Sequence, residues 1–136
     1  MTEQLIVWEE GRELGRKFDV DEFRENIDGL EIRLTNVDTE EKIILSYDYN
    51  NCIVCGYKSI DESYWLDKLN TYIKKYDKSF ITQHTFFEVL SSSFVEEIVN
   101  GSCNMLQSSQ LFHLKIVAAD SILDIVSAGK PIIRKI

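Results

Sequence analysis

The sequence has little proline, little glycine and no long apolar run. It contains 1 proline and 6 glycines among 136 residues, and its longest apolar stretches, such as residues 5–8, are four residues long. A helix needs about 20 apolar residues to span a bilayer, so we predict no membrane-spanning segment. The first residues lack the basic and apolar regions of a secretory signal. We therefore expect a cytoplasmic protein.

Cysteine is also scarce. The chain has 3 cysteines, an odd number that does not fit a disulfide-rich secreted scaffold. The segment Cys52-Ile53-Val54-Cys55-Gly56 has the shape of a zinc knuckle and could recruit Cys103 and His113. A structural zinc site usually needs a second pair of thiolates or imidazoles, which the sequence lacks. We therefore expect no metal and no cofactor, with the cysteines buried and unreactive.

Common catalytic motifs are missing as well. The sequence contains no nucleophile motif of the G-x-S-x-G type, no phosphate-binding loop and no dinucleotide fingerprint. The 2 histidines, His84 and His113, fall within predicted strands, where a half-buried hydrogen-bonded role is more common than catalysis. The adjacent glutamates at 40–41 and 96–97 do not face one another. We therefore predict that the protein is not an enzyme.

Acidic residues are abundant, and they are unevenly distributed. The formal net charge is −8 at pH 7; residues 1–50 carry 14 acidic against 6 basic residues, while residues 51–136 carry 9 of each. Nucleic-acid binding requires a basic face, so we expect neither DNA nor RNA as a partner. The excess instead predicts a binding site for a basic protein, formed by Glu9, Glu10, Glu13, Asp19, Asp21, Glu22, Glu25 and Asp28. The alternative is that these acids only keep the protein soluble.

A capping pattern in the acidic region predicts a short helix at residues 20–28. Asp19 can accept hydrogen bonds as the N-cap, and Glu22 lies three residues later, as in a capping box. Phe18 can also pack on Phe23 as a hydrophobic staple. The state of the charged residues just before this segment stays open.

The other elements follow from the spacing of apolar residues. We predict strands at residues 5–8, 30–35, 42–47, 52–57, 80–90, 111–118 and 131–136. Ser59 is the expected N-cap of the longest helix, which ends near Tyr76 and carries the apolar stripe Trp65, Leu69, Tyr72, Ile73 and Tyr76. A shorter helix is predicted at residues 91–99, where serines at its start act as caps. Another is predicted to begin after Asp120 and to end at Gly129.

These elements predict one α+β domain over residues 1–136. A content of 44% hydrophobic and 28% charged residues is typical of a packed globular protein. Strands occur in runs, with helices between them at irregular intervals, so we expect an antiparallel or mixed sheet of about five to seven strands. Helices should cover this sheet, with one long helix near residues 60–76.

Two segments resemble an uncharacterised family of small acidic Firmicute proteins. They are YKSIDESY at residues 57–64, and HLKIV at 113–117 followed by DSILDIVS at 120–127. The resemblance covers roughly residues 30–136. It implies an α+β protein that acts as an immunity or antitoxin partner of a secreted toxin, and it brings no catalytic residues.

Three functions therefore remain open. The first is a non-enzymatic interaction module whose acidic N-terminal third binds a basic protein, such as the toxin of an immunity protein. The second is a small-ligand-binding module with an apolar cavity between the sheet and the long helix. The third is a metal-binding or hydrolytic protein that uses its cysteines and histidines. The sequence leaves the oligomeric state open.

Overall fold

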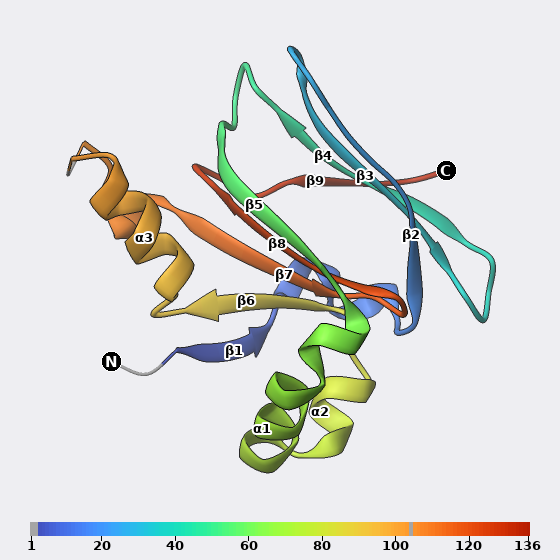
Figure 1. Cartoon of the computed structure of the whole chain (residues 1–136). Helices are drawn as coiled ribbons and strands as arrows, with labels where there is room; N and C mark the ends of the chain where they lie inside the picture. The colour runs from blue at the N-terminus through green and yellow to red at the C-terminus, as the bar shows by residue number, and fades with distance from the viewer. Residues whose placement is uncertain (1–2, 104) are drawn as a thin grey trace.

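The computed structural model describes residues 3–103 and 105–136 and contains two antiparallel sheets with helices (Figure 1). Sheet A has five strands in the order β1-β6-β7-β8-β5, and sheet B has four in the order β2-β3-β4-β9. The predicted α+β class is confirmed. The expectation of one sheet with about five to seven strands fits only loosely: the described residues form nine strands in two sheets, because two segments predicted as helices are strands.

The element bounds are as follows. Sheet A contains β1 (Gln4–Val7), β5 (Val54–Asp61), β6 (Phe86–Leu90), β7 (Phe112–Val117) and β8 (Ser121–Ser127). Sheet B contains β2 (Phe18–Asn26), β3 (Gly29–Asn36), β4 (Lys42–Asp48) and β9 (Ile132–Lys135). The α-helices are α1 (Leu66–Tyr76), α2 (Lys78–Thr82) and α3 (Ser93–Gly101), and the 3-10 helices are η1 (Glu9–Leu14), η2 (Glu62–Trp65) and η3 (Ser108–Gln110).

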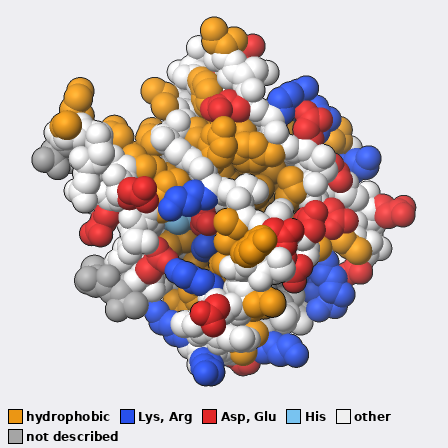
Figure 2. Space-filling view, viewed as in Figure 1, with side chains coloured by type: hydrophobic (Ala, Val, Ile, Leu, Met, Phe, Trp, Pro, Cys, Tyr) orange, Lys and Arg blue, Asp and Glu red, His pale blue; other side chains and the backbone are white. Residues whose placement is uncertain are grey.

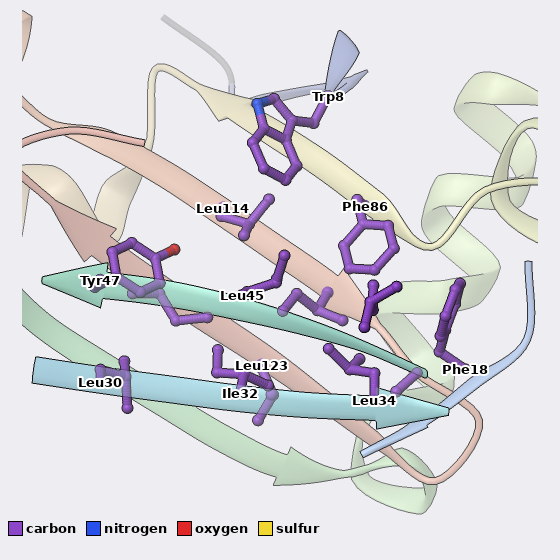
Figure 3. Close-up of a cluster of buried hydrophobic side chains, with 14 of the residues drawn as sticks. Trp8, Phe18, Leu30, Ile32, Leu34, Leu45, Tyr47, Phe86, Leu114 and Leu123 are labelled. Carbon is purple, nitrogen blue, oxygen red and sulfur yellow. The ribbon is translucent and has the colours of Figure 1, made fainter. Parts of the chain in front are cut away.

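The main core lies between the two sheets. Alternate residues of β3 are buried, as expected of a strand with one face on the core. Their side chains share one apolar cluster with sheet A side chains such as Leu114 and Leu123, and with Trp8 and Phe18 (Figure 3). Because this cluster contains side chains from both sheets, sheet A and sheet B pack face to face.

Helices cover the other face of sheet A. Phe86 belongs to the core between the sheets, and the next residue, Phe87, points the opposite way into a second cluster with Trp65 and Tyr72. Four residues of the predicted apolar stripe therefore belong to this second cluster or pack against it, whereas Ile73 is half-buried outside it. Helix α3 covers a different part of the same face, where the Phe94 ring lies 5.8 Å from the ring of His113.

The segment predicted as a helix at residues 20–28 is strand β2 instead. Its pairing with β3 shifts register between Val20 and Glu22, which indicates a β-bulge. The bulge adds one residue between the inward-facing Val20 and Phe23, so the apolar spacing changes from two to three residues. A spacing of three residues is also typical of a helix, and Asp19 is a common N-cap residue, so the segment was predicted as a capped helix.

The segment after Asp120 is also a strand, β8. It is an interior strand of sheet A, between β7 and β5, with Ile122 in the cluster under α1, and Leu123 and Ile125 in the core between the sheets. A strand that is buried on both faces has no alternation of apolar and polar residues. Its apolar run therefore resembled the buried face of a helix.

Three further boundaries differ from the prediction. The strand expected at 52–57 begins at Val54, because the Cys52 N–H donates to the Asp48 carbonyl in the preceding turn. It extends through Ser59, so Asp61, not Ser59, caps the next helical turn by accepting from the Ser63 N–H. The predicted strand 80–90 begins as helix α2 and becomes a strand only at β6.

The remaining strands and helices lie near their predicted positions. Strands occur where they were expected near residues 5–8, 30–35, 42–47, 111–118 and 131–136. A helix follows the serines at 91–93, with Ser92 as its N-cap. The longest helix, α1, is shorter than expected, with 11 residues.

Candidate functional site

The acidic residues predicted to bind a partner lie on several parts of the fold. Glu9, Glu10 and Glu13 are in η1. Glu9 pairs with Arg12, and Glu10 lies 3.0 Å from Lys130. These pairings compensate part of the negative charge of η1.

The other acids follow β2 and the turn after it. Asp19, Asp21, Glu22 and Glu25 are in β2, and Asp28 is in the turn to β3. Glu22 lies opposite Arg33, on the outer face of sheet B, whereas Glu25 lies opposite the buried Leu30, on the inner face. The acids of β2 therefore point to both sides of the sheet and do not form one continuous face.

Glu25 is distinguished by its aromatic neighbours. Its carboxylate accepts a hydrogen bond from the hydroxyl of Tyr57, at 3.0 Å, and another from the hydroxyl of Tyr49. The rings of Tyr57 and Phe23 are 4.8 Å apart. We call these four residues, Phe23, Glu25, Tyr49 and Tyr57, the Glu25 site.

The Glu25 site lies where the edges of the two sheets approach each other. Phe23 and Glu25 come from β2, the edge strand of sheet B, and Tyr57 comes from β5, the edge strand of sheet A. Figure 2 shows hydrophobic side chains gathered at the surface over the region between β5 and sheet B. Tyr57 is 43% exposed, so a partner can reach its ring.

The environment keeps both tyrosines protonated. The hydrogen bond to Glu25 raises the pKa of Tyr57, and burial followed by the bond to Glu25 raises the pKa of Tyr49. Both hydroxyls therefore remain donors to the carboxylate at neutral pH. They fix its position beside the Phe23–Tyr57 ring pair.

A second polar cluster lies on the helix-covered face of sheet A. The Oγ atom of Ser92 is 2.6 Å from Nδ1 of His113, and Nε2 of His113 is 2.7 Å from Oδ1 of Asp124. Lys115 Nζ also lies 3.0 Å from Oδ1 of Asp124. We call the first three residues the Ser92–His113–Asp124 chain. Ser92, His113 and Lys115 are buried.

A hollow of about 450 Å³ adjoins this chain, with Ser92 and His113 in its lining. Burial alone would raise the pKa of Asp124, but the hydrogen bond from His113 and the charge of Lys115 outweigh that effect and lower it. The carboxylate is therefore ionised at neutral pH. It accepts the Nε2–H of His113.

The remaining sequence candidates are separate from both clusters. Cys52 is buried, Cys55 is half-buried and Cys103 is exposed, and all are free thiols. His84 lies in the turn before β6, not in a strand, and burial lowers its pKa. Within residues 3–103 and 105–136, no three His, Cys, Asp or Glu side chains are grouped as a metal site.

Comparison with models of protein families, with curated proteins and with solved structures gives no match. In the described parts of the chain, every helix is too short or too polar to cross a bilayer.

Sequence reasoning treated the three members of the Ser92–His113–Asp124 chain separately. Ser92 was named only as part of a helix cap, and Asp124 was placed in a helix. The residues are 21 and 11 positions apart, and sheet pairing brings them together. One signal was present: His113, Lys115 and Asp124 are polar residues inside strongly apolar segments, where a buried charge requires partners.

Proposed function

We propose that the protein is an interaction module that binds a basic protein through the Glu25 site. This binding requires no catalysis. The observation that supports it most directly is a carboxylate held by two tyrosine hydroxyls beside the exposed ring of Tyr57, which packs on the half-buried Phe23. A lysine or arginine of the partner could pair with Glu25 and lie over the Tyr57 ring.

The composition of the site fits a protein partner. Tyrosine supplies a large contact area with few rotatable bonds and is enriched at the centres of protein interfaces. The net charge of −8 adds a long-range attraction for basic molecules. An immunity protein that neutralises a basic toxin is one form of this function, and the family resemblance of residues 57–64 and 113–127 suggests it.

An arginine-rich peptide tests the proposal. We expect the largest amide shift changes in a nuclear magnetic resonance titration at Phe23, Glu25 and Tyr57. An exposed ion pair contributes about 0.2–1 kcal/mol, and the substitution leaves the Tyr57 ring in place, so Glu25→Gln should weaken binding by up to about fivefold.

Glu41→Gln is the matched control, because it removes one exposed carboxylate outside the Glu25 site. It should change the dissociation constant by less than twofold. Equal weakening by both substitutions, with shift changes spread over η1 and the turns, would mean that the acids act only as a general negative surface.

A further inference from the structure

Ser92 occupies a sharp turn between a strand and a helix. Strand β6 ends at Leu90 and α3 begins at Ser93, and the connecting residue Ser91 has a φ of 54°. This positive φ is uncommon for a residue with a side chain and marks local strain. Nucleophilic serines of hydrolases often lie at a strand-to-helix turn; here the strained residue is Ser91, and Ser92 itself is extended, with a φ of −71° and a ψ of 127°.

The hydrogen bonds of the Ser92–His113–Asp124 chain have a defined direction. The ionised Asp124 can only accept, so His113 donates its Nε2–H to Oδ1. In the neutral imidazole, Nδ1 then has no proton and accepts the hydroxyl proton of Ser92 across 2.6 Å. A base that is hydrogen-bonded to a hydroxyl and oriented by a carboxylate is the arrangement that activates a serine nucleophile.

A backbone donor lies beside Ser92. The N–H of Ser93, the residue after the nucleophile, donates to Oε1 of Glu3 at 3.0 Å, and the Ser93 hydroxyl donates to the same oxygen at 3.3 Å. In hydrolases with this turn, the backbone N–H after the serine stabilises the oxyanion of the tetrahedral intermediate. A carboxylate oxygen of the chain itself therefore lies where such an oxyanion would bind.

The adjoining hollow can accommodate a small substrate. Its volume of about 450 Å³ is within the range of small-molecule sites. Val89, Val95 and Phe112 supply apolar lining, and Glu88 and Glu96 supply negative charge. This lining favours an uncharged or cationic molecule over an anionic one.

We propose that Ser92 is an acyl-accepting nucleophile for small uncharged or cationic carboxylic esters. His113 is its general base, and Asp124 is a positioning residue. The inference goes beyond the binding function of the Glu25 site and departs from the expectation that the protein is not an enzyme. That expectation rested on local motifs, whereas this arrangement is formed by tertiary structure.

The reaction is a conventional acyl transfer. Ser92 Oγ forms a bond to the carbonyl carbon of the ester while its proton moves to His113 Nδ1. The bond to the leaving alcohol then breaks, and His113 returns the proton to that alcohol. Water next attacks the acyl group and gives its proton to His113. The Oγ–carbon bond breaks and Ser92 recovers the proton, so one ester and one water yield one acid and one alcohol.

Ser92 also has a structural role, since its Oγ accepts the Val95 N–H at 3.0 Å as the N-cap of α3. A loss of function after substitution could therefore reflect unfolding. The first measurement uses the unmodified protein to avoid this problem. An alkyl fluorophosphonate reacts with an activated serine by forming an Oγ–phosphorus bond and releasing fluoride, and the hydroxyl proton moves to the base.

We expect one phosphonyl group per chain by intact mass, located on Ser92 by peptide mapping. Ser92→Asn, which retains a capping side chain, should abolish labelling. His113→Gln should slow it by about 100-fold or more.

Glu3→Ala should accelerate labelling of Ser92, because the Ser93 N–H becomes free. Ser59→Ala, at an exposed position in β5, should leave the rate unchanged.

Asp124→Asn tests the positioning role. The change should slow labelling and shift His113 from the Nε2–H to the Nδ1–H tautomer, because the amide introduced at position 124 can donate to Nε2, and the ring ¹⁵N chemical shifts report which nitrogen carries the proton. A purely structural role would leave the tautomer of His113 unchanged. The proposal fails if the folded wild-type protein is not phosphonylated, if the label is on another residue, or if folded His113→Gln is labelled at the wild-type rate. Binding at the Glu25 site would be unaffected by any of these results.

Discussion

Trp65 shows how exposure separates a core residue from a surface neighbour. It is 3% exposed and packs 5.6 Å from Tyr72, while the adjacent Tyr64 is 84% exposed. Trp65→Ala should destabilise the protein by about 3–5 kcal/mol, the usual range for a buried Trp or Phe truncation. Tyr64→Ala should cost less than about 0.5 kcal/mol. Urea denaturation of both variants measures the difference, and similar unfolding midpoints would mean that Trp65 is not a core anchor.

Asp124 predicts a pH dependence of stability. Its pKa is lower in the folded protein than the ordinary value of 3.8. Its contribution is therefore complete well above pH 3.8 and is lost as the pH falls through the lower folded value. We expect acid unfolding of the wild type to be steeper below pH 4 than that of Asp124→Asn. Parallel acid-unfolding curves would contradict this assignment.

At the scale of elements, the spacing of apolar residues predicted strands with one buried face correctly. It failed for strands that are bulged or buried on both faces. Strand β3 alternates regularly, so its period of two was visible. Strand β2 contains a bulge, and β8 is buried on both faces. Each departs from the simple period for a tertiary reason, which is why both were predicted as helices. The candidate site was partly predictable, because Glu25 was among the acids named. Tyr49 joins it through strand pairing within sheet B, and Tyr57 joins it only through packing of the two sheets.

The hairpin formed by β3 and β4 depends on a close backbone approach at Gly29. A Cβ atom there would lie 2.1 Å from the Tyr47 carbonyl oxygen. Gly29→Ala should therefore displace β3 from β4 and cost about 1–3 kcal/mol or more. At Gly101, by contrast, a Cβ would meet no atom within 4 Å.

Gly101→Ala is thus the control for this hairpin, and it should be neutral or stabilise α3 by up to about 1 kcal/mol. Thermal melts of the two variants provide the comparison. Equal melting temperatures would show that the β3 and β4 backbones can separate without cost.

At the scale of the whole molecule, the excess of acids predicts salt-sensitive association. Replacing Asp21, Glu22 and Glu25 by Asn or Gln removes three negative charges from β2. The association rate with an arginine-rich peptide should fall and its dependence on salt should weaken. Stability should change by less than about 1 kcal/mol, because the Glu22–Arg24 pair is exposed and the new amide oxygens can still accept from the hydroxyls that Asp21 and Glu25 bind. An unchanged rate and salt slope would leave solubility as the role of these acids.

The position of β1 beside β6 has a consequence for synthesis of the chain. Gln4 pairs with Leu90, 86 residues later. Strand β1 therefore cannot join sheet A until β6 has been synthesised. At about 5–20 residues per second, the ribosome separates these two strands by roughly 4–17 s. During that interval the apolar residues of β1 have no native partner, and only the shortness of the strand, 4 residues, limits misplaced pairing. Protease cleavage of ribosome-stalled chains should therefore detect an accessible N-terminus until residue 90 has emerged.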